Sequence, residues 1–246
     1  MLPQSPHLAD YSATLEEDGA AVLPFGLERS MVSRLVAAVE KLEVGEGVRR
    51  RGDVYAVRNL IALVPVVLEP LSVSPVRSLV ESILGPRVFA VDGILFNKTL
   101  RANWKVTWHQ DLSIAVRRRA DVPGFGPWST KAGIAHVQPP VSVFENLLAL
   151  RLHLDGAGED NGALRVVPGS HRLGRLSATA IGEITAAGRA KVCAVTAGGI
   201  VVMRPLCLHA SSSAKQATNR RVVHLVLAAH DLPCPLEWNE THSVAS

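Results

Sequence analysis

The sequence predicts a mainly β (α+β) domain, an antiparallel sandwich or barrel with flanking helices. After Pro86, short runs of β-forming residues alternate with turn residues, and several runs alternate apolar and polar side chains with a period of two. Before Pro86, helical periodicity and short strands are mixed. The 246 residues show no internal repeat and no linker rich in Gly, Ser or Pro, which favours a single domain over residues 1–246.

The N-terminal segment is predicted to form a short helix followed by a short strand. The helix is expected over residues 12–17 and ends at Asp18-Gly19, because glycine commonly terminates a helix. The strand is expected over residues 20–23 and ends at Pro24, which cannot donate a backbone hydrogen bond to a sheet.

Two longer helices are predicted before residue 86. Ser30 is expected to cap the first, whose apolar residues recur with the helical period. The second is expected to begin at Ser74-Pro75, a capping residue followed by proline at the first helical position, and to end at Gly85. The apolar faces comprise Met31, Val32, Leu35, Val36, Val39 and Leu42 in the first helix, and Val76, Leu79, Val80, Ile83 and Leu84 in the second.

The β-rich remainder of the chain contains one exceptional stretch. The strands are expected over residues 88–96, 104–108, 147–154, 163–167, 199–204 and 221–228. Residues 123–140 are instead predicted to form a long loop that acts as a lid, because their four prolines oppose strand pairing. Its candidate hinges are Gly124, Gly126 and Gly133, and its candidate apolar plugs are Phe125 and Trp128.

The composition is that of a folded globular protein, with 48% hydrophobic and 20% charged residues. The three cysteines, Cys193, Cys207 and Cys234, are an odd number without close spacing. This pattern argues against a disulfide framework and against a structural zinc site. We therefore expect reduced and mostly buried thiols.

Hydropathy and charge argue against two classes of partner. The apolar runs are shorter than the about 18 residues of a membrane span, and residues 1–10 lack the basic flank and apolar core of a signal peptide. We therefore expect a cytoplasmic protein without a membrane partner. The formal net charge is +4, but the basic residues are dispersed apart from the run 117–119, so we expect no nucleic-acid partner.

The chemistry of the chain is indicated first by a His-x-Asp motif, His109-Gln110-Asp111. In a strand, residues i and i+2 point to the same face, so an imidazole and a carboxylate would lie side by side. With one distant histidine they form a two-histidine, one-carboxylate ligand set. Such a set suits Fe(II) and leaves coordination positions open.

The third ligand must come from a distant part of the chain. The candidates are His136, His153, His171, His209, His224 and His230. His209 stands out because it closes an apolar strand over 199–208 and precedes a polar turn, as a residue at the mouth of a barrel would. His171 lies in a Pro-Gly turn and is interpreted as structural, whereas His224 is either a core residue or a pocket residue.

Five features stand in a fixed order along the chain. They are Trp108-His109-Gln110-Asp111; Asn161-Gly162-Ala163-Leu164-Arg165-Val166-Val167-Pro168-Gly169-Ser170-His171; the strand 199–204; His209 followed by Ser211; and Arg220, eleven residues after His209. In this order they resemble the phytanoyl-CoA dioxygenase family, and Asn97-Lys98 with Asn103-Trp104 resembles its bacterial members. The similarity runs from about Asp18 to about His230. The combination of motifs is specific, although each motif alone is not.

The resemblance implies a fold, a reaction and residue roles. It implies a double-stranded β-helix (jelly-roll) barrel, and an enzyme that uses Fe(II), 2-oxoglutarate and O2 to hydroxylate a small-molecule substrate with release of succinate and CO2. His109, Asp111 and His209 match the iron ligands. Arg220 matches the arginine that pairs with the distal carboxylate of 2-oxoglutarate, for which a bidentate guanidinium is suited. The positions assigned to further cosubstrate contacts are Ser211, Gln110 and Asn97.

The sequence departs from the family pattern at two places. Some members carry a tryptophan near the cosubstrate on the strand before the Asn-Gly turn, and Arg151 takes its place here. Arg221 follows Arg220 directly, which leaves a one-residue ambiguity in the arginine that holds the cosubstrate. The unit from Asn161-Gly162, a strong hairpin signal, to His171 is interpreted as construction of the barrel.

Other functions on a similar scaffold remain as alternatives. Halogenases replace the carboxylate ligand by a small residue, so the presence of Asp111 argues against one. A cupin-like metal-binding barrel with isomerase or hydrolase chemistry, or a non-catalytic binding module, is disfavoured by Arg220. Desaturation and ring formation stay open beside hydroxylation, as does the oligomeric state. An anionic substrate is indicated by the cationic residues that are expected to flank the pocket, Lys98, Lys105, Arg117, Lys131 and His136.

Overall fold

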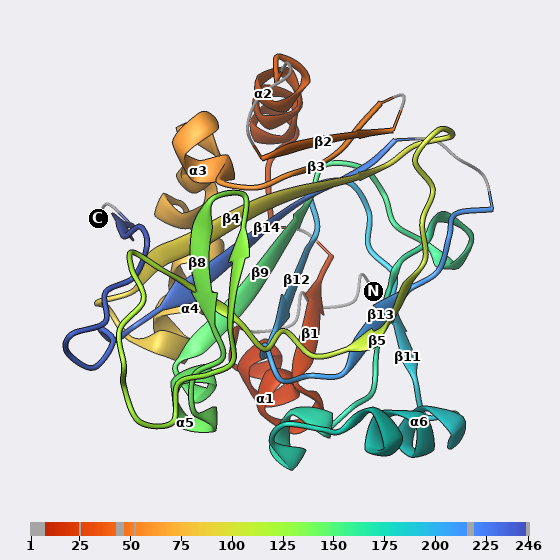
Figure 1. Cartoon of the computed structure of the whole chain (residues 1–246). Helices are drawn as coiled ribbons and strands as arrows, with labels where there is room; N and C mark the ends of the chain where they lie inside the picture. Colours follow the sequence, from red (N-terminus) through yellow and green to blue (C-terminus); the bar gives the residue numbers. More distant parts are fainter. Residues whose placement is uncertain (1–7, 25, 43–46, 52, 216–218, 245–246) are drawn as a thin grey trace.

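The structure is a computed structural model that describes residues 8–24, 26–42, 47–51, 53–215 and 219–244, and it is built on antiparallel sheets (Figure 1). The largest sheet has the strand order β1-β12-β9-β14-β4-β3-β2, and β15 pairs with β4. Its strands are β1 (Ala20–Leu23), β12 (Ile200–Met203), β9 (Leu147–His153), β14 (Arg220–Ala228), β4 (Phe89–Lys98), β3 (Asp53–Val57), β2 (Val48–Arg51) and β15 (His242–Ser243).

A smaller sheet of order β11-β10-β13-β5 packs against the largest one and completes the jelly-roll barrel that the sequence predicted. A third sheet, of order β6-β8-β7, stands beside the barrel. In Figure 1, β5, β13 and β11 lie to the right of β9 and β14, and β8 lies to their left. The strands are β11 (Lys191–Cys193), β10 (Leu164–Val166), β13 (His209–Ser211), β5 (Val106–His109), β6 (Ile114–Val116), β8 (Ile134–Val137) and β7 (Trp128–Lys131).

Alternation along the central strands separates a core face from a cavity face. On β9, Leu148, Leu150 and Leu152 are fully buried in the main apolar cluster. Arg151 points to the opposite face, as the two-residue period of a strand requires, and lines a cavity. The neighbouring strand β14 repeats the pattern and places His224 in the same cavity.

The helices near the N-terminus cover the core face of the largest sheet. Leu15, Leu35 and Leu79, from three of these helices, are buried in the same cluster as the strand leucines. The helices of this layer are α1 (Leu8–Asp18), α2 (Arg29–Glu40), α3 (Leu60–Leu63), a 3-10 helix (Pro65–Ser72) and α4 (Val76–Leu84). The chain also contains α5 (Val141–Glu145), α6 (Ala178–Ala186) and two short 3-10 helices (Glu159–Asn161 and Ser170–Leu173).

The predicted helices are present, but their caps differ from the prediction. α2 begins at Arg29, and Glu28 occupies the capping position without a side-chain capping bond, so Ser30 already lies inside the helix. α4 begins at Val76, with Pro75 rather than Ser74 at the capping position. In both places the capping sequence pattern was misleading, and each helix begins without a side-chain capping bond. Gly85 ends α4 with a positive φ of 85°, as expected.

The predicted loop 123–140 contains a β-hairpin, so the loop assignment was wrong. β7 and β8 pair through a tight turn at Ala132 and Gly133, whose φ angles of 48° and 77° are typical of a two-residue hairpin turn. The prolines oppose pairing only where they lie, and they flank the hairpin instead of interrupting it. These prolines are Pro123, Pro127, Pro139 and Pro140.

Two connections also differ from expectation. The Asn161-Gly162 pair does not join a hairpin, because β9 and β10 belong to different sheets; Gly162, with φ 64°, ends a 3-10 turn. His209 does not close the strand that begins near residue 200. β12 ends at Met203, and after a turn His209 begins β13 in the smaller sheet.

The cysteine prediction holds for two of the three residues. Cys193 and Cys207 are free and buried, whereas Cys234 is free and exposed. Among the helices that the structure describes, none is long and apolar enough to cross a membrane.

We predict that Leu150→Ala lowers the free energy of unfolding by about 2–5 kcal/mol, because it leaves a cavity between β9 and the helices. Leu100, which is 80% exposed, provides a matched control, and Leu100→Ala should change this free energy by no more than about 0.5 kcal/mol. Urea unfolding of both variants measures the two effects. Equal losses would contradict the assignment of the core.

Candidate metal centre

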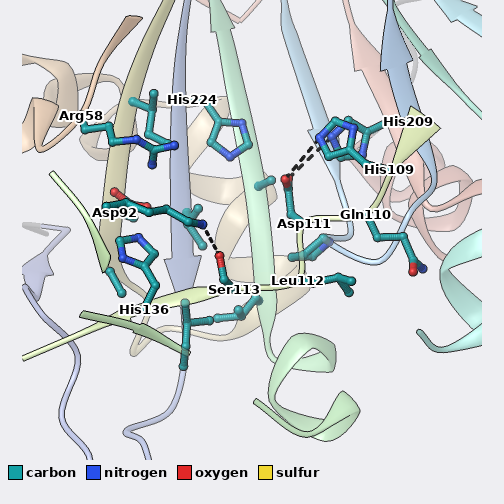
Figure 2. Close-up of a pocket in the computed structure, with 18 of the residues that line it drawn as sticks. Arg58, Asp92, His109, Gln110, Asp111, Leu112, Ser113, His136, His209 and His224 are labelled. Carbon is teal, nitrogen blue, oxygen red and sulfur yellow. Dashed lines mark hydrogen bonds and ion pairs between the residues drawn. The ribbon is translucent and has the colours of Figure 1, made fainter. Parts of the chain in front are cut away.

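A cavity of about 560 Å³ lies between the two sheets of the barrel. Its walls come from β4, β9 and β14 of the largest sheet, from β5 and β13 of the smaller sheet, and from the β7–β8 hairpin. Figure 2 shows a group of histidines and acidic residues that point into it. The cavity is therefore the place where the polar residues singled out in the sequence can meet.

The predicted ligands His109, Asp111 and His209 come together in this cavity (Figure 2). Asp111 Oδ1 lies 3.8 Å from His109 Nε2, and Asp111 Oδ2 lies 3.8 Å from His209 Nε2. One ligand atom from each of the three residues lies within 4.8 Å of the other two. This spacing allows one metal ion to contact all three side chains.

The hydrogen bonds of the two histidines leave their Nε2 atoms free for a metal. His109 Nδ1 lies 2.9 Å from the carbonyl oxygen of Thr107, and His209 Nδ1 lies 2.8 Å from that of Cys207. Because a carbonyl only accepts, each Nδ1 carries the proton and each Nε2 presents a lone pair. Burial lowers the pKa of His209 to about 4, which keeps its ring neutral. Two imidazole nitrogens and a carboxylate form a ligand set that suits Fe(II).

Strand pairing positions the ligands. β5 and β13 are adjacent and antiparallel, and His109 and His209 are direct partners across them. Asp111 lies two residues beyond His109, just after β5 ends, and its backbone N–H donates to the carbonyl of Pro205 at 3.0 Å. The predicted side-by-side placement of His109 and Asp111 is therefore present, although Asp111 is outside the strand.

The Pro-Gly-Ser-His turn braces the segment before His209. The Ser170 hydroxyl donates to the carbonyl of Val167 at 2.6 Å and accepts from the N–H of Leu208 at 2.8 Å. His171 does not reach the cavity; its ring packs so closely on Gly19 that a Cβ there would lie 2.4 Å from His171 Nδ1. These contacts agree with a structural role for the turn.

Gln110 is occupied by the protein itself. Its Nε2 donates to the carbonyls of Gly174 at 2.8 Å and Leu206 at 2.7 Å, and its Oε1 accepts from the N–H of Leu176 at 2.9 Å. Figure 2 shows the side chain directed away from Asp111. These bonds tie the loop after residue 173 to the end of β5, and they leave the expected cosubstrate contact of Gln110 without support.

Two cations lie side by side at one end of the barrel. Arg220 on β14 and Lys98 on β4 are direct strand partners and are 2% and 0% exposed. Lys98 Nζ donates to Ser211 Oγ at 3.0 Å and to the carbonyl of Ser212. Arg220 Nη1 donates to the carbonyl of Gly162 at 2.8 Å, whereas Arg220 Nε has no hydrogen-bond partner within the described residues.

The close approach around these cations requires glycine at position 162. Gly162 has a positive φ of 64°, and a Cβ there would lie 2.5 Å from the carbonyl oxygen of Ser212 and 3.1 Å from Lys98 Nζ. Any other residue would push away Lys98 or the segment after β13 that contains Ser212. The Asn161-Gly162 pair thus belongs to the surroundings of Lys98 and Arg220.

The electrostatics of this end favour an anionic ligand. Burial and the nearby Arg151 lower the pKa of Arg220 to about 9, and burial and Arg220 lower the pKa of Lys98 to about 7. Among the described residues, no carboxylate forms an ion pair with any of these three cations. Because unpaired buried cations are costly, the site is suited to an acid that carries at least two charges.

The end of the barrel that holds Arg220 and Lys98 is called the cation end below. Arg151 lies between the cation end and the metal ligands. Its Nη1 lies 3.1 Å from His224 Nδ1, and its guanidinium stands 5.9 Å from the ring centre of Phe96. Because guanidinium only donates, His224 accepts through Nδ1 and carries its proton on Nε2. His224 lines the cavity but is not part of the metal-ligand group, which makes it a pocket residue.

The side chains of Arg220 and Arg221 point in opposite directions. Arg221 points out of the barrel, where its Nε and Nη2 bind the two carboxylate oxygens of Asp155 at 2.8 Å and its Nη1 binds Glu40. Arg220 lines the cavity. Arg220 is therefore the arginine that can reach a ligand there.

Lys98 was expected only to flank the pocket, whereas the cosubstrate contact was assigned to its neighbour Asn97. Asn97 and Lys98 are consecutive on β4 and face opposite sides, and the Asn97 amide donates to Asn219 Oδ1 at 3.3 Å. Lys98 shares its face with Phe96, which lines the cavity. Counting that alternation would have favoured Lys98 over Asn97 as the residue beside the cosubstrate.

We predict that the protein binds one Mn(II), a redox-stable probe for divalent metals, and that His209→Ala weakens this binding by more than about tenfold, because one of three ligands is lost. His171→Ala is the matched control, since His171 lies outside the cavity. Calorimetric titration under identical buffer conditions measures both. Unchanged affinity of the His209→Ala protein would refute the metal centre.

Solved structures of similar fold support the jelly-roll assignment. EvdMO1 superposes with a TM-score of 0.66 at 21% identity, over 90% of this chain and 50% of that chain. EctD from S. alaskensis with 2-oxoglutarate and 5-hydroxyectoine superposes with a TM-score of 0.68 at 17% identity, over 93% of this chain and 78% of that one. The epimerase SnoN in complex with Fe3+, alpha ketoglutarate and nogalamycin RO gives 0.66 at 17%, over 96% and 94%.

At these identities the likenesses show the fold alone. The present chain spans about half the length of EvdMO1. No curated protein matches the sequence. The family model of phytanoyl-CoA dioxygenase (PhyH), in contrast, matches residues 15–222, which include every member of the metal-ligand group and Arg220. By this match the chain belongs to the phytanoyl-CoA dioxygenase family.

Proposed function

We propose that this protein is a non-haem Fe(II)- and 2-oxoglutarate-dependent oxygenase that oxidises a small molecule, with iron held by His109, Asp111 and His209. The observation that carries the proposal is the presence, in one cavity, of a metal-ligand group and a buried arginine, Arg220, that forms no ion pair with any residue the structure describes. A metal site alone would also suit a cupin-like isomerase or hydrolase. The cation end supplies what such an enzyme does not need, a counter-charge for a dicarboxylic cosubstrate.

The cosubstrate would lie between the metal ligands and the cation end. Arg220 would bind its distal carboxylate through the Nε–H, which has no partner among the described residues. Lys98 supports the same end through Ser211, whose hydroxyl it already contacts. Arg151, close to both ends, adds a third positive charge where the family pattern has an apolar ring.

Iron bound to the three ligands would supply the activation of O2 that accompanies decarboxylation of 2-oxoglutarate to succinate and CO2 and oxidation of the substrate. The protein residues fix positions and limit the access of water. Hydroxylation is the outcome that we propose, as the name 5-hydroxyectoine suggests for EctD. SnoN, an epimerase on a similar fold, shows why the outcome must be measured.

We predict that Arg220→Ala weakens binding of 2-oxoglutarate by about 2–5 kcal/mol, because a buried carboxylate loses its charged partner. Arg221→Ala is the matched control and should leave this affinity unchanged, since Arg221 is engaged with Asp155 outside the cavity. Titration of 2-oxoglutarate into the Fe(II)-loaded protein without oxygen, followed by its visible absorption band, gives both affinities. The opposite order of effects would place the cosubstrate arginine one residue later.

We also predict that Asp111→Ala abolishes the release of succinate from 2-oxoglutarate in the presence of Fe(II) and O2, because the metal loses its anionic ligand. His171→Ala should keep wild-type release. A library of small molecules is screened for stimulated succinate formation by the wild-type protein. Substrate turnover without succinate would favour the cupin-like alternative.

The β7–β8 hairpin replaces the predicted loop as the candidate guard of the metal centre. Trp128 lines the main cavity, whereas Phe125 lines a separate cavity of about 300 Å³. We predict that Trp128→Ala increases the amount of succinate formed per substrate molecule oxidised, because water gains access to the metal. Phe125→Ala should change this ratio much less. Measurement of both products in one reaction tests the prediction, and equal ratios in all three proteins would remove the guarding role.

A further inference from the structure

The end of the cavity away from the metal ligands carries a second group of charged side chains. Arg58, Asp92, Lys131 and His136 line this end. Figure 2 shows Arg58, Asp92 and His136 on the side of the cavity away from His109 and His209. The charges of Arg58 and Lys131 act on each other and on Asp92, which agrees with their gathering in one place.

Three separate parts of the fold build this group. Arg58 follows β3 and precedes Asn59, whose positive φ of 57° turns the chain sharply into α3. Such a conformation is unfavourable for most residues and is tolerated best by Asn, Asp and Gly. Asp92 comes from β4, and Lys131 ends strand β7 of the hairpin. The backbone of Arg58 is thus held between β3 and the turn at Asn59 that leads into α3.

The group has an excess of positive charge. Within the described residues, neither Arg58 nor Lys131 forms an ion pair with a carboxylate; Lys131 Nζ donates to the hydroxyl of Ser113. Asp92 is the acidic member of the group, and burial, with a contribution from Glu240, raises its pKa to about 6. Arg58 and Lys131 therefore share this end of the cavity with one lining carboxylate, Asp92, while Asp111 and Glu240 also act on the group electrostatically.

Part of the cavity wall is apolar. It is formed by side chains from α5, from the strands β6, β7 and β14, and from the C-terminal segment. These are Ile114, Trp128, Phe144, Val226 and Trp238. A ligand that fills the cavity therefore meets an apolar surface as well as the charged groups.

We propose that Arg58 and Lys131 bind an oxyanion of the substrate, such as a carboxylate, so that the substrate is an amphipathic acid whose apolar part lies toward the metal ligands. The assignment of this ligand as the substrate rests on the function proposed above. The binding site itself does not, because it uses none of the metal-ligand or cosubstrate residues. A guanidinium from the β3–α3 turn and an ammonium from β7 can bind the oxyanion together.

The test uses a matched pair of fluorescent probes. 8-Anilinonaphthalene-1-sulfonate is an amphipathic anion, and N-phenyl-1-naphthylamine has the same aromatic rings without the sulfonate. We expect Lys131→Met and Arg58→Gln each to raise the dissociation constant of the sulfonate by about tenfold. The dissociation constant of the neutral probe should stay within about twofold, because the apolar wall is unchanged.

Three further variants fix the sign and the location of the effect. Asp92→Asn should tighten sulfonate binding, because it removes the negative charge of the group. Lys131→Arg should restore most of the affinity that Lys131→Met loses, which also controls for misfolding. Arg118→Gln is the matched surface control; Arg118 is exposed, does not line the cavity and should have no effect.

The outcomes separate this inference from the proposed function. Absence of sulfonate binding by the wild-type protein, or equal effects of Lys131→Met on both probes, would overturn the anion site. Weaker binding after Asp92→Asn would overturn it as well. Titration of 2-oxoglutarate into the same preparations is scored independently. Failure of that binding, with the sulfonate results as expected, would refute the oxygenase and leave the anion site in place.

Discussion

The backbone pairing of β5 with β13 is the constraint on which the metal centre depends. It makes His109 and His209 direct partners, although one hundred positions separate them in the sequence. Side chains alternate along a strand, so a slip of one residue in β13 would turn His209 away and present Leu208 or Ala210 instead. The hydrogen bonds from each histidine Nδ1 to a backbone carbonyl then orient the two rings. The geometry of the ligands is therefore set by the hydrogen bonds of the protein before any metal arrives.

The two faces of β9 and β14 have different roles, one in stability and the other in chemistry. One face packs leucines and valines against the helices and supplies the core. The other carries Arg151, His224 and Arg220 into the barrel, where burial opposes their charged forms. His153, on the same face of β9, is fully buried and has no hydrogen-bond partner within the described residues. Such a face lowers the stability of the ligand-free protein, and an anion that binds there restores part of it by mass action.

Much of the metal centre could be predicted because its information is local. Strand periodicity places His109 and Asp111 on one side, and the motif order in the sequence selects His209. The remaining features arise from contacts that no local pattern encodes. Arg58 reaches the cavity through a turn between β3 and α3, and the hairpin within residues 123–140 was hidden by its flanking prolines. The cosubstrate contact was assigned to Asn97 and not to Lys98, because the alternation of side chains along β4 was not taken into account.

The separate β6–β8–β7 sheet has a consequence for how this protein can be altered. This sheet shares no strand with the two sheets that hold the metal ligands and the cation end, among the strands described. Yet it contributes Trp128, Lys131 and His136 to the wall that a substrate would meet. Insertions, deletions or exchange of the hairpin can thus alter what the cavity accepts without disturbing the register that makes the metal site. A new hairpin grafted between the flanking prolines is therefore a route to a new specificity.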